Sequence, residues 1–491
     1  MTDTISFNMA NQLSAETFSG GTLNGLSITN AYDTYLRRAA VALSSQTSTL
    51  VNYGYDTAGR LQGVTNGSYN MLYTYLANSP LASQITFNSS STTRMMTAKA
   101  YDFLNRLSSI SSTPSGASPV SYSYQYNTAN QRVRTTLADG SAWEFIYDPL
   151  GQVVSGHKFF SDGTPVAGQQ FDYSFDNIGN RTQTLAGGDQ NGSNQRSSTY
   201  STDLLNRYSQ RTVPGYADIM GVSFATNSVT VGGQTAYRKG EYFRNQLAVN
   251  NSAAVWTNIV VAGTGQTSVT GNVFVAASTE NYGYDADGNL TGDGRWTYTW
   301  DGENRLVSMQ GLSGIPTGAK LKLDFVYDYQ GRRMQKMVST NNGSSYYAQS
   351  TNRFVYDGWN VVAVVNPASS VLQSFVWGLD LSGSQQGAGG VGGLLEINDS
   401  INGVYFPAYD GNGNVAGLTK GTDGTIAAQY EYGSFGEVLR ATGSMAKANL
   451  FRFSTKYQDD ESDLLYYGYR YYNAGTGRWL SHDPLKELAA C

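Results

Sequence analysis

Short stretches in which aromatic residues alternate with polar ones recur along most of the chain. In residues 51–61, Tyr53 and Tyr55 alternate with Asn and Gly, and an Asp-x-x-Gly-Arg segment and an apolar residue follow. Alternation with a period of two is typical of a strand with one buried face, and Asp and Gly at these positions are typical of a tight turn. The pattern therefore predicts a strand, a turn and a return strand.

The same unit recurs with variation, which makes it an internal repeat. Further copies begin at Tyr101, Tyr126, Tyr147, Phe175, Tyr284, Trp300 and Tyr327. Asn takes the place of the turn glycine in the copy at 101–107, which is acceptable where the backbone needs a positive φ. The Asp can accept hydrogen bonds from backbone N–H groups two residues on, and the Arg can lie over an aromatic ring. Because one hairpin is marginally stable alone, we expect the hairpins to stack into a continuous sheet.

Composition supports an all-β protein with many hairpins. Charged residues make up 14% of the chain, against roughly 25% in an ordinary globular protein. The chain holds 36 tyrosines and 55 glycines. Tyr, Thr and Val suit a pleated, half-buried surface, whereas Gly and Asn suit tight turns.

Charge and cysteine content exclude several classes of partner. The net charge is -5 and there is no block of Lys and Arg, so we expect no nucleic-acid partner. The one cysteine is Cys491, which leaves no internal disulfide framework and no thiolate metal cluster. No apolar run approaches the roughly 20 residues that span a bilayer, and the first residues lack the basic and apolar regions of a signal peptide.

Two segments resemble ligand-binding motifs but lack the required context. Residues 387–392 fit G-x-G-x-x-G, yet a dinucleotide fingerprint needs a strand before it and a helix after it. The residues that follow read as strand and hairpin, so we interpret the segment as a glycine-rich connector. Residues 285–289 begin like a calcium loop, but the positions that need Gly and Glu hold Leu290 and Trp296. We interpret this segment, and 410–414, as turns, and we expect no cofactor and no metal site.

Candidates for catalysis are few. The two histidines, His157 and His482, lie far apart in sequence, and no hydrolase or zinc-protease motif is present. Asp459, Asp460 and Glu461 form an acidic cluster. A glycosidase needs two carboxyl groups held across its substrate, and we interpret this run of adjacent acids as a solvated turn.

The Y-D-x-x-G-R-L units resemble the YD repeats of the Rhs family, which also occur in teneurins and in the C component of insecticidal toxin complexes. The stretch from Val404, VYFPAYDGNGNVAGLTKGTDGTIAAQYEYGSFGEVLRATG, and the segment 451–485 resemble the Rhs repeat-associated core domain. The resemblance implies a β-sheet that spirals into a hollow shell, which in the family encloses a C-terminal toxin. It also implies three parts: an irregular, β-rich segment at 1–50, a YD-repeat region at 51–400, and a core domain at 401–491 that is truncated after its first D-P motif. Within the first part, residues 35–43 are compatible with a helix.

The resemblance also supplies two candidate site residues. In the family, a D-P motif at the place of Asp483-Pro484 and a second one downstream provide aspartates for self-cleavage. Carried over by motif, Asp483 is one aspartate and Arg478 is the nearby cation that steadies it. Two adjacent carboxyl groups can divide the acid and base roles because one pKa is raised. The residues after Pro484 are LKELAAC, without a second D-P, so we expect a strand-ending turn there and no enzymatic activity.

These observations favour a structural shell, acting as container or carrier in a bacterial polymorphic toxin system and lacking its toxin domain here. The alternatives are a cell-surface adhesion module that binds carbohydrate or protein, and a self-cleaving aspartyl protease. A container predicts aromatic side chains that line the interior or stack between strands, whereas an adhesin predicts an exposed aromatic patch.

The shell interpretation also predicts partners and a location. The expected partners are a toxin cargo or a delivery component supplied by another chain, a glycan or surface protein, and further copies of the chain through open sheet edges. The expected location is the cytoplasm before export, and then the medium or the cell surface by a non-classical route.

Overall fold

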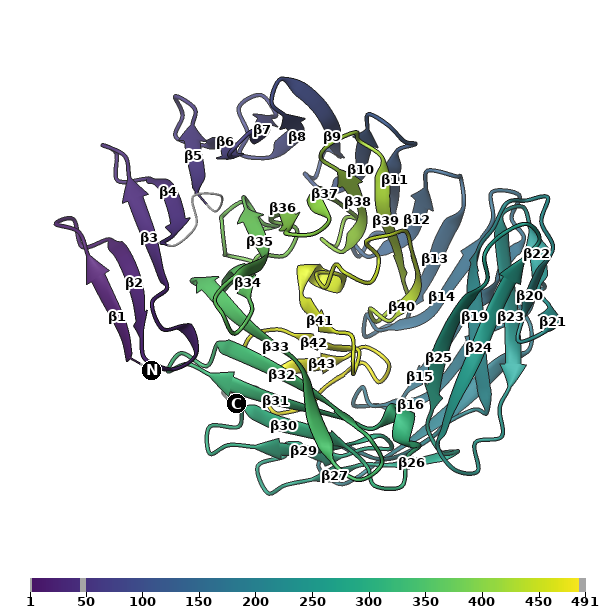
Figure 1. The fold of residues 1–491 in the computed structure, drawn as a ribbon. Coiled ribbons are helices and arrows are strands. Elements are labelled where there is room, and N and C mark those ends of the chain that lie inside the picture. The colour runs from purple at the N-terminus through teal and green to yellow at the C-terminus, as the bar shows by residue number, and fades with distance from the viewer. Residues whose placement is uncertain (1, 45–49, 485–491) are drawn as a thin grey trace.

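A computed structural model describes residues 2–44 and 50–484. Two antiparallel sheets, of 19 and 14 strands, contain most of the chain. In Figure 1 the first sheet runs along an arc, and the second sheet extends the arc and then turns inward. The helical elements that the structure describes are short 3₁₀ turns, η1 (Gly21–Leu23), η3 (Thr317–Ala319) and η4 (Phe453–Thr455). The predicted all-β fold of stacked hairpins is confirmed.

The first sheet is a meander in which each strand pairs with the next one in sequence, and β26 (Thr279–Asn281) joins it beside the last strand. Its other strands are β1 (Thr2–Phe7), β2 (Leu13–Ser19), β3 (Ser27–Tyr32), β4 (Arg38–Leu43), β5 (Val51–Tyr55), β6 (Leu61–Asn66), β7 (Tyr69–Tyr75), β8 (Ala82–Ser89), β9 (Thr92–Tyr101), β10 (Leu107–Pro114), β11 (Val120–Tyr126), β12 (Arg132–Leu137), β13 (Ala142–Tyr147), β14 (Val153–Phe159), β15 (Pro165–Phe175), β16 (Arg181–Gly187), β17 (Gln195–Thr202) and β18 (Tyr208–Thr212).

The second sheet is also a meander in sequence order. Its strands are β27 (Gly283–Tyr284), β28 (Leu290–Gly292), β29 (Trp296–Trp300), β30 (Leu306–Gly311), β31 (Leu321–Tyr327), β32 (Arg333–Asn341), β33 (Tyr346–Asp357), β34 (Asn360–Val365), β35 (Val371–Trp377), β36 (Leu394–Asp399), β37 (Gly403–Tyr409), β38 (Val415–Lys420), β39 (Ile426–Tyr432) and β40 (Val438–Thr442).

Three small sheets complete the fold. Two of them come from the segment between β18 and β26: one orders β19 (Tyr216–Val222), β23 (Tyr242–Ala248) and β22 (Tyr237–Lys239), and the other orders β21 (Gln234–Thr235), β20 (Val229–Val231), β24 (Val255–Gly263) and β25 (Val269–Val275). The third contains β41 (Tyr457–Asp459), β42 (Leu464–Tyr466), β43 (Tyr471–Asn473) and β44 (Arg478–Trp479), and lies inside the arc in Figure 1.

The predicted domain boundaries at 50/51 and 400/401 fall within these ladders. β4 pairs with β5 across the first boundary, and β36 pairs with β37 across the second. Residues 35–43, which are compatible with a helix by sequence, form a turn followed by β4. Backbone hydrogen bonding is thus continuous through both boundaries, and the division into three domains stays a prediction.

The repeat turns have the geometry that the sequence predicts. In the unit at 55–61, Asp56 Oδ1 accepts hydrogen bonds from the backbone N–H groups of Ala58 (2.9 Å) and Arg60 (2.8 Å). The Arg60 guanidinium pairs with Asp56 and lies 4.4 Å from the centre of the Tyr75 ring. The turn residue has a positive φ whether it is Gly59 (80°) or Asn105 (59°). Local chemistry therefore determines each turn.

The repeat tyrosines have a second function that the sequence analysis did not identify. After each repeat turn the strand register shifts by one residue, as at 107–109, and such a bulge disrupts the ladder hydrogen bonds. The hydroxyl of the next repeat tyrosine donates to the carbonyl oxygen at the bulge, as Tyr126 does to Leu107 (2.7 Å) and Tyr101 does to Ala82 (2.9 Å). Tyrosine therefore satisfies the backbone acceptor that the preceding turn leaves unpaired.

The first sheet and strands β27 to β33, which extend its arc, form the outer layer that we call the wall. The main core lies between this wall and strands β34 to β40 at the inner end of the second sheet. The rings of Phe87 on β8 and Phe406 on β37 are 5.3 Å apart, and both are buried. The Tyr53 hydroxyl on β5 donates to the Trp377 carbonyl oxygen on β35 (3.3 Å). The core aromatic residues Phe87 and Phe406 are thus enclosed between two β layers, whereas repeat aromatics such as Tyr101 and Tyr126 are half-buried.

Candidate functional site

The two candidate residues near the C-terminus have different partners. The carboxylate of Asp483 forms an ion pair with Arg470 (2.7 Å), whose guanidinium lies 4.2 Å from the centre of the Trp479 ring. Arg478 donates instead to Asn180 Oδ1 (2.6 Å) and lies 4.6 Å from the centre of the Tyr208 ring. The structure therefore gives Asp483 a different cation from the predicted Arg478.

Strand geometry explains why Arg478 and Arg470 have different partners. Arg478 and Trp479 are consecutive residues of β44, and consecutive side chains leave opposite faces of a strand. Trp479 faces Arg470, whereas Arg478 reaches the outer sheet at β18. The pairing of Arg478 with Asp483 was carried over by motif, and the self-cleavage roles of these two residues stay a prediction.

The acidic cluster at 459–461 is not a solvated turn, and that prediction is wrong for Asp459. Asp459 is 1% exposed, and its carboxylate lies 2.6 Å from Arg333 Nη1 and 3.0 Å from Lys336 Nζ. Glu461 pairs with Lys336 (2.9 Å), and Asp460 pairs with Arg452 (2.6 Å). The cluster joins the inner sheet that starts at β41 to β32 of the wall.

Arg333 is the centre of this network. The residue is fully buried, and its guanidinium lies against a cage of aromatic rings. The ring centres are 4.6 to 5.8 Å from its Cζ atom, and they belong to Phe325, Phe354, Tyr457, Tyr466 and Tyr471. Ring faces stabilise a desolvated cation, so the cage supports the nitrogen atoms of Arg333 that do not face Asp459.

Electrostatics keep Asp459 ionised in this site. Burial would raise the pKa of Asp459, but the charges of Arg333 and Lys336 outweigh it and hold the pKa below its usual value. The network therefore holds the Asp459 carboxyl group in its ionised form, and this group carries no proton that it could donate. The sequence does contain a signal for this ion network, because Arg332, Arg333 and Lys336 lie close together in one repeat of a charge-poor chain. Such cations need acidic partners when they are buried.

A second buried ion network connects the first strands to the same repeat. Arg332 pairs with Asp328 (2.6 Å), with Glu16, and more distantly with Asp3 (3.9 Å). Burial and the neighbouring Glu16 raise the pKa of Asp3 to about 7. These carboxyl groups share one cation, and Arg332 thereby ties β1 and β2 to the turn before β32.

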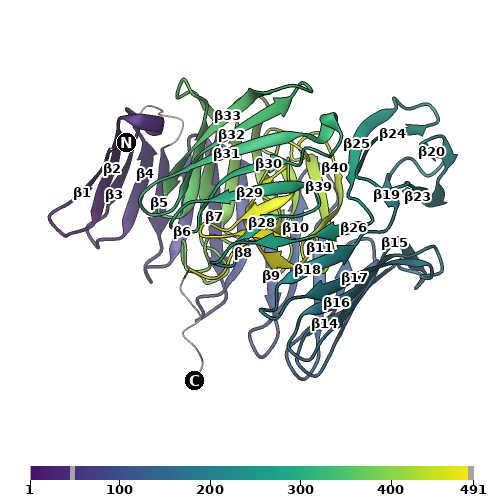
Figure 2. The same cartoon turned by 90° about the horizontal axis from the view of Figure 1, so that it is seen from below.

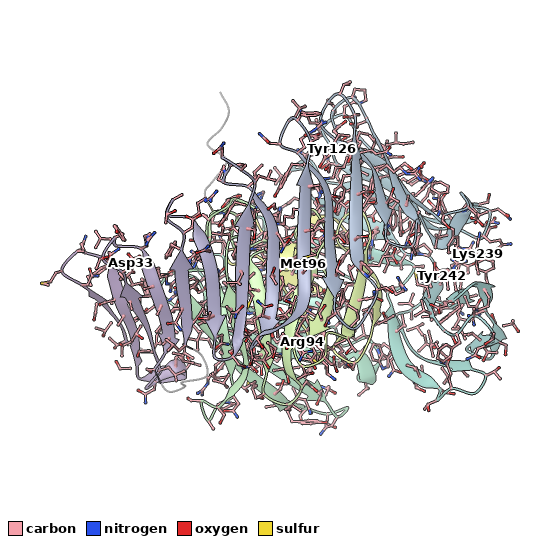
Figure 3. All side chains as sticks on the ribbon, turned by 90° about the horizontal axis from the view of Figure 1, so that it is seen from above. Asp33, Arg94, Met96, Tyr126, Lys239 and Tyr242 are labelled. Carbon is pink, nitrogen blue, oxygen red and sulfur yellow. The ribbon has the colours of Figure 1, made fainter. Side chains whose placement is uncertain are left out.

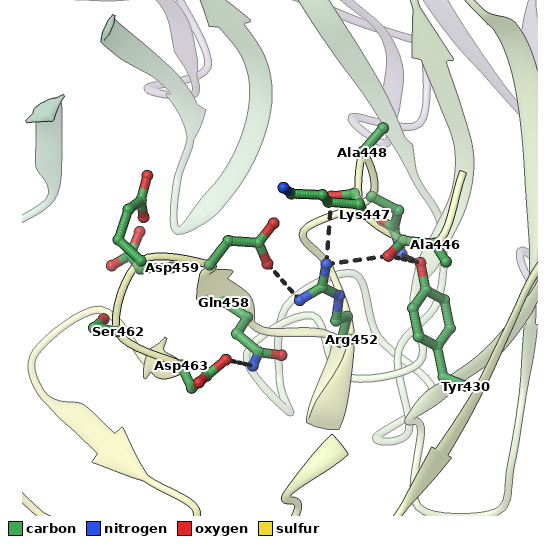
Figure 4. A network of polar contacts seen from close by, with 12 residues as sticks. Tyr430, Ala446, Lys447, Ala448, Arg452, Gln458, Asp459, Ser462 and Asp463 are labelled. Carbon is green, nitrogen blue, oxygen red and sulfur yellow. Dashed lines mark hydrogen bonds and ion pairs between the residues drawn. The ribbon is translucent and has the colours of Figure 1, made fainter. Parts of the chain in front are cut away.

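Figure 4 shows a third network, around Arg452. Its guanidinium donates to Asp460 Oδ1 (2.6 Å) and to the carbonyl oxygens of Ala446 (3.1 Å) and Lys447 (3.4 Å). The Tyr430 hydroxyl also donates to the Ala446 carbonyl oxygen (2.9 Å). Arg452 therefore fixes the irregular segment 443–452, which connects the second sheet to β41.

A partly open cavity of about 1200 Å³ lies between the first sheet and strands β38 to β40 at the end of the second sheet. Its lining comes from β11 to β14, from β22 and β23, and from β38 to β40, and includes Trp143 and Tyr432. Lys158 and Glu431 form a buried pair on its surface, and Arg440 adds a second contact to Glu431 (3.3 Å). Although burial opposes ionisation, Lys158 and Arg440 hold the pKa of Glu431 at about 2.

The glycine-rich and acidic loops are structural, as predicted. In 285–289 the backbone N–H of Asn289 donates to Asp285 Oδ1 (2.8 Å), and the loop at 410–414 repeats this bond (3.0 Å). Within residues 380–393 the Asp380 carboxylate accepts bonds from the N–H groups of Ala388 (2.7 Å) and Gly390 (3.1 Å). Over residues 2–44 and 50–484 we find no cluster of His, Cys, Asp or Glu able to hold a metal ion, and no helix long and apolar enough to cross a membrane.

Comparison with known proteins gives partial matches. No protein-family model matches the chain. The tRNA3(Ser)-specific nuclease WapA of Bacillus spizizenii is 31% identical over 216 residues, which are 43% of this chain and 8% of that protein. The double-stranded DNA deaminase toxin A of Burkholderia cenocepacia is 26% identical over 235 residues, which are 44% of this chain and 16% of that protein. The chain thus spans a small part of the curated relatives it matches.

Solved structures give matches over nearly the whole chain. In the crystal structure of TcdB2-TccC3-Cdc42, 26% of the matched chain aligns with 98% of this one, at 16% identity and a TM-score of 0.40. TcdB2-TccC3 without its hypervariable C-terminal region aligns with 99% of this chain, at 14% identity and a TM-score of 0.41. By name, the Burkholderia relative is a DNA deaminase toxin and the Bacillus relative is a tRNA nuclease.

Proposed function

We propose that the chain is a wall segment of a Rhs-type β shell and acts as a container or carrier in a bacterial toxin system. The observation that carries the proposal is the curved arrangement of the sheets: the second sheet turns inward from the end of the first, and a partly open cavity of about 1200 Å³ lies between the first sheet and strands β38 to β40. The name of the Burkholderia relative, a DNA deaminase toxin, supports the connection with toxins.

The positions of the aromatic side chains favour a container over an adhesin. A glycan-binding surface needs ring faces that a sugar can reach from solvent. The repeat tyrosines are half-buried, as Tyr101 and Tyr126 are, or buried, as Tyr409 is, and their hydroxyl groups donate to bulge carbonyls, for example from Tyr409 to Leu394 (2.6 Å). The tyrosine hydroxyl groups are therefore occupied by hydrogen bonds within the wall.

The proposal includes no enzymatic role for this chain. Asp459 and Glu431 are held ionised by neighbouring cations, Asp285 and Asp380 accept hydrogen bonds within their loops, and Asp483 is paired with Arg470. In this proposal the partners are a toxin cargo or delivery component from another chain, and the protein leaves the cytoplasm by a non-classical route. Self-cleavage would shorten the purified protein, and Asp483→Asn would restore the full-length mass. We expect the full-length mass for both proteins.

Enclosure can be tested by the size of reagent that reaches the cavity. In a Cys491→Ser background, Gln429→Cys places a thiol on the exposed cavity lining, and Thr74→Cys places one on the exposed face of β7. We expect a small maleimide to label both proteins and a 5 kDa polymer maleimide, roughly the size of a small protein domain, to label Thr74→Cys alone. Equal polymer labelling of both sites would overturn the enclosure.

Cargo protection tests the functional part. The protein is expressed with and without the polypeptide encoded immediately downstream in its source genome, and both samples are treated with protease. We expect that polypeptide to be digested more slowly in the presence of the shell. Equal digestion rates, with enclosure confirmed by labelling, would refute a container for that cargo.

A further inference from the structure

One edge of the first sheet carries a row of exposed apolar side chains. In a meander, alternate turns lie on the same edge of the sheet. The turns that join β1 to β2, β3 to β4, and each later odd strand to the next even one therefore share an edge, which we call the repeat-turn edge. It contains residues 8–12, 33–37, 56–60, 76–81, 102–106, 127–131, 148–152, 176–180 and 203–207. In Figure 3 Asp33 and Tyr126 lie toward this edge, and Arg94 lies toward the opposite one.

The tips of these turns project apolar groups into solvent. Phe103 and Leu204 are completely exposed, at 108% and 102%. The other large apolar residues exposed on this edge or beside it are Phe7, Met9, Tyr35, Leu36, Leu76, Leu104, Leu150, Ile178 and Leu205. On the opposite edge, within the described residues, Leu50 is the large apolar side chain that is exposed. The asymmetry exceeds the scattered exposure that is normal for single apolar residues.

The turn itself does not need these side chains. The unit at 56–60 forms the same hydrogen bonds with Thr57 and Ala58 at its tip. In the second sheet, two of the corresponding tips carry Asp287 and Glu303, and a third carries the exposed Tyr329. Apolar tips are therefore not required by the turn motif, and they form a row on the first sheet's repeat-turn edge.

The edge is electrically suited to face a copy of itself. Its tip residues carry no charge, and the arginines behind them are neutralised within their own turns, as Arg106 is by Asp102 (2.7 Å) and Arg207 is by Asp203 (2.8 Å). In a two-fold interface each patch meets the same patch of the partner. A row of like charges would repel there, whereas an uncharged apolar row is self-complementary.

The shape of the edge also fits a two-fold contact. Figure 1 shows the first sheet as an arc, and in Figure 2 the turn tips follow a sloping line along the lower edge, so the tips lie close to one plane. Alternate strands are about 10 Å apart, so the tips form a row of knobs with gaps wide enough for a side chain. A two-fold axis that lies in that plane passes through the middle of the arc. It places each turn tip of one copy opposite a turn tip of the second copy, whose row runs in the reverse order.

We propose that two copies of this chain dock through their repeat-turn edges, tip against tip, with a two-fold axis through the turn at 102–106. The exposed apolar side chains along the whole repeat-turn edge present an accessible surface on the order of 1,000 Å². This area is comparable with the roughly 800 Å² per partner that a standard interface buries. The partner is a second copy of this chain, and the inference does not depend on the proposed container function.

The oligomeric state of the full chain tests this contact. All proteins carry Cys491→Ser to prevent disulfide dimers. Sedimentation and light scattering compare this parent with a rim variant, Phe103→Ser/Leu204→Ser/Leu205→Ser. The matched control, Phe224→Ser/Val269→Ser/Ile401→Ser, changes exposed apolar residues elsewhere.

We expect a dimer for the parent and the control and a folded monomer for the rim variant, because every substituted side chain is exposed on the single chain and its loss leaves the fold intact. The rim variant loses only the stabilisation that dimer formation adds by mass action. A monomeric parent at high concentration, or a rim variant that stays dimeric, overturns the proposal. A monomeric parent that floats with phosphatidylcholine vesicles, when the rim variant does not, assigns the edge to a lipid surface instead.

Cross-linking tests the axis. The two-fold places the turn at 33–37 of one copy near the turn at 176–180 of the other. An equimolar mixture of Thr34→Cys and Asn177→Cys proteins is expected to cross-link between chains with a bismaleimide of about 10 Å span, which matches the tip spacing. Cross-links within each single variant but not in the mixture would contradict this axis.

Discussion

Glu396 is a buried carboxyl group whose ionisation opposes folding. It lies on β36 between the two layers, is fully buried, and accepts a hydrogen bond from Asn66 Nδ2 (2.8 Å) through Oε1. Its Oε2 atom has no hydrogen-bond partner. Burial raises the pKa of Glu396 from 4.5 to about 8, and the bond from Asn66 offsets this only in part.

The sign and size of the effect follow from this shift. The folded state binds the proton more tightly than the unfolded state, so the free energy of unfolding falls as pH rises from the unfolded pKa toward the folded one. Each pH unit within that window costs about 1.4 kcal/mol. Between pH 5 and pH 8, Glu396 therefore removes about 3 kcal/mol of stability. Above pH 8 the loss levels off.

Glu396→Gln tests this reasoning because glutamine keeps the shape and remains uncharged. Urea unfolding, followed by tryptophan fluorescence at pH 5, 6, 7 and 8, gives the difference in unfolding free energy between the variant and the wild type. We expect this difference to move by about 3 kcal/mol in favour of the variant from pH 5 to pH 8. The control is Glu241→Gln, at an exposed position. A difference that is constant across this range would refute the assignment.

Three further predictions concern the ion network, the bulges and one strained turn. Asp459→Asn leaves two buried cations without their carboxylate, including Arg333, and is expected to cost about 3–5 kcal/mol in urea unfolding. Tyr101→Phe leaves the bulge carbonyl of Ala82 unpaired and is expected to cost about 1–2 kcal/mol in the same assay. Leu36 has φ 63°, a conformation that costs an L-residue about 1–2 kcal/mol, so Leu36→Gly is expected to raise the melting temperature.

Exposed variants provide the controls for these predictions. Glu303→Gln, Tyr35→Phe and Leu104→Gly make the same chemical changes at exposed positions, and each is expected to alter stability by less than about 1 kcal/mol. If Asp459→Asn costs no more than Glu303→Gln, the ion network is not a stabilising contact. If Tyr101→Phe is as mild as Tyr35→Phe, water satisfies the bulge carbonyl. If Leu36→Gly melts below the wild type, the leucine contacts outweigh its backbone strain.

The repeat turns could be predicted from sequence because their contacts are local. The carboxylate of Asp56, the positive φ of Asn105 and the position of Arg60 over an aromatic ring all depend on residues within one hairpin or its neighbour. The same reasoning failed to recognise the unit at 32–37, because Leu36 occupies the glycine position there. An apolar side chain conceals the backbone conformation that a glycine or asparagine would have indicated.

The candidate site could be predicted only as a set of residues. Asp459 reads as a surface acid, and its burial depends on Arg333, which lies 126 positions earlier and reaches it only when β41 packs inside the wall. The partner of Asp483 is decided by the two faces of the β43–β44 hairpin rather than by sequence distance.

What the sequence by itself determined is the repeated hairpin, with its turn chemistry and its alternating buried face, because these depend on hydrogen bonds and side-chain periods within a few residues. What only the tertiary structure decided is where the hairpins lie relative to one another. The inward turn of the second sheet, the buried carboxyl of Glu396 and the cavity all arise from contacts across hundreds of positions. Curvature and packing of the sheets determine those contacts, and no local pattern encodes them.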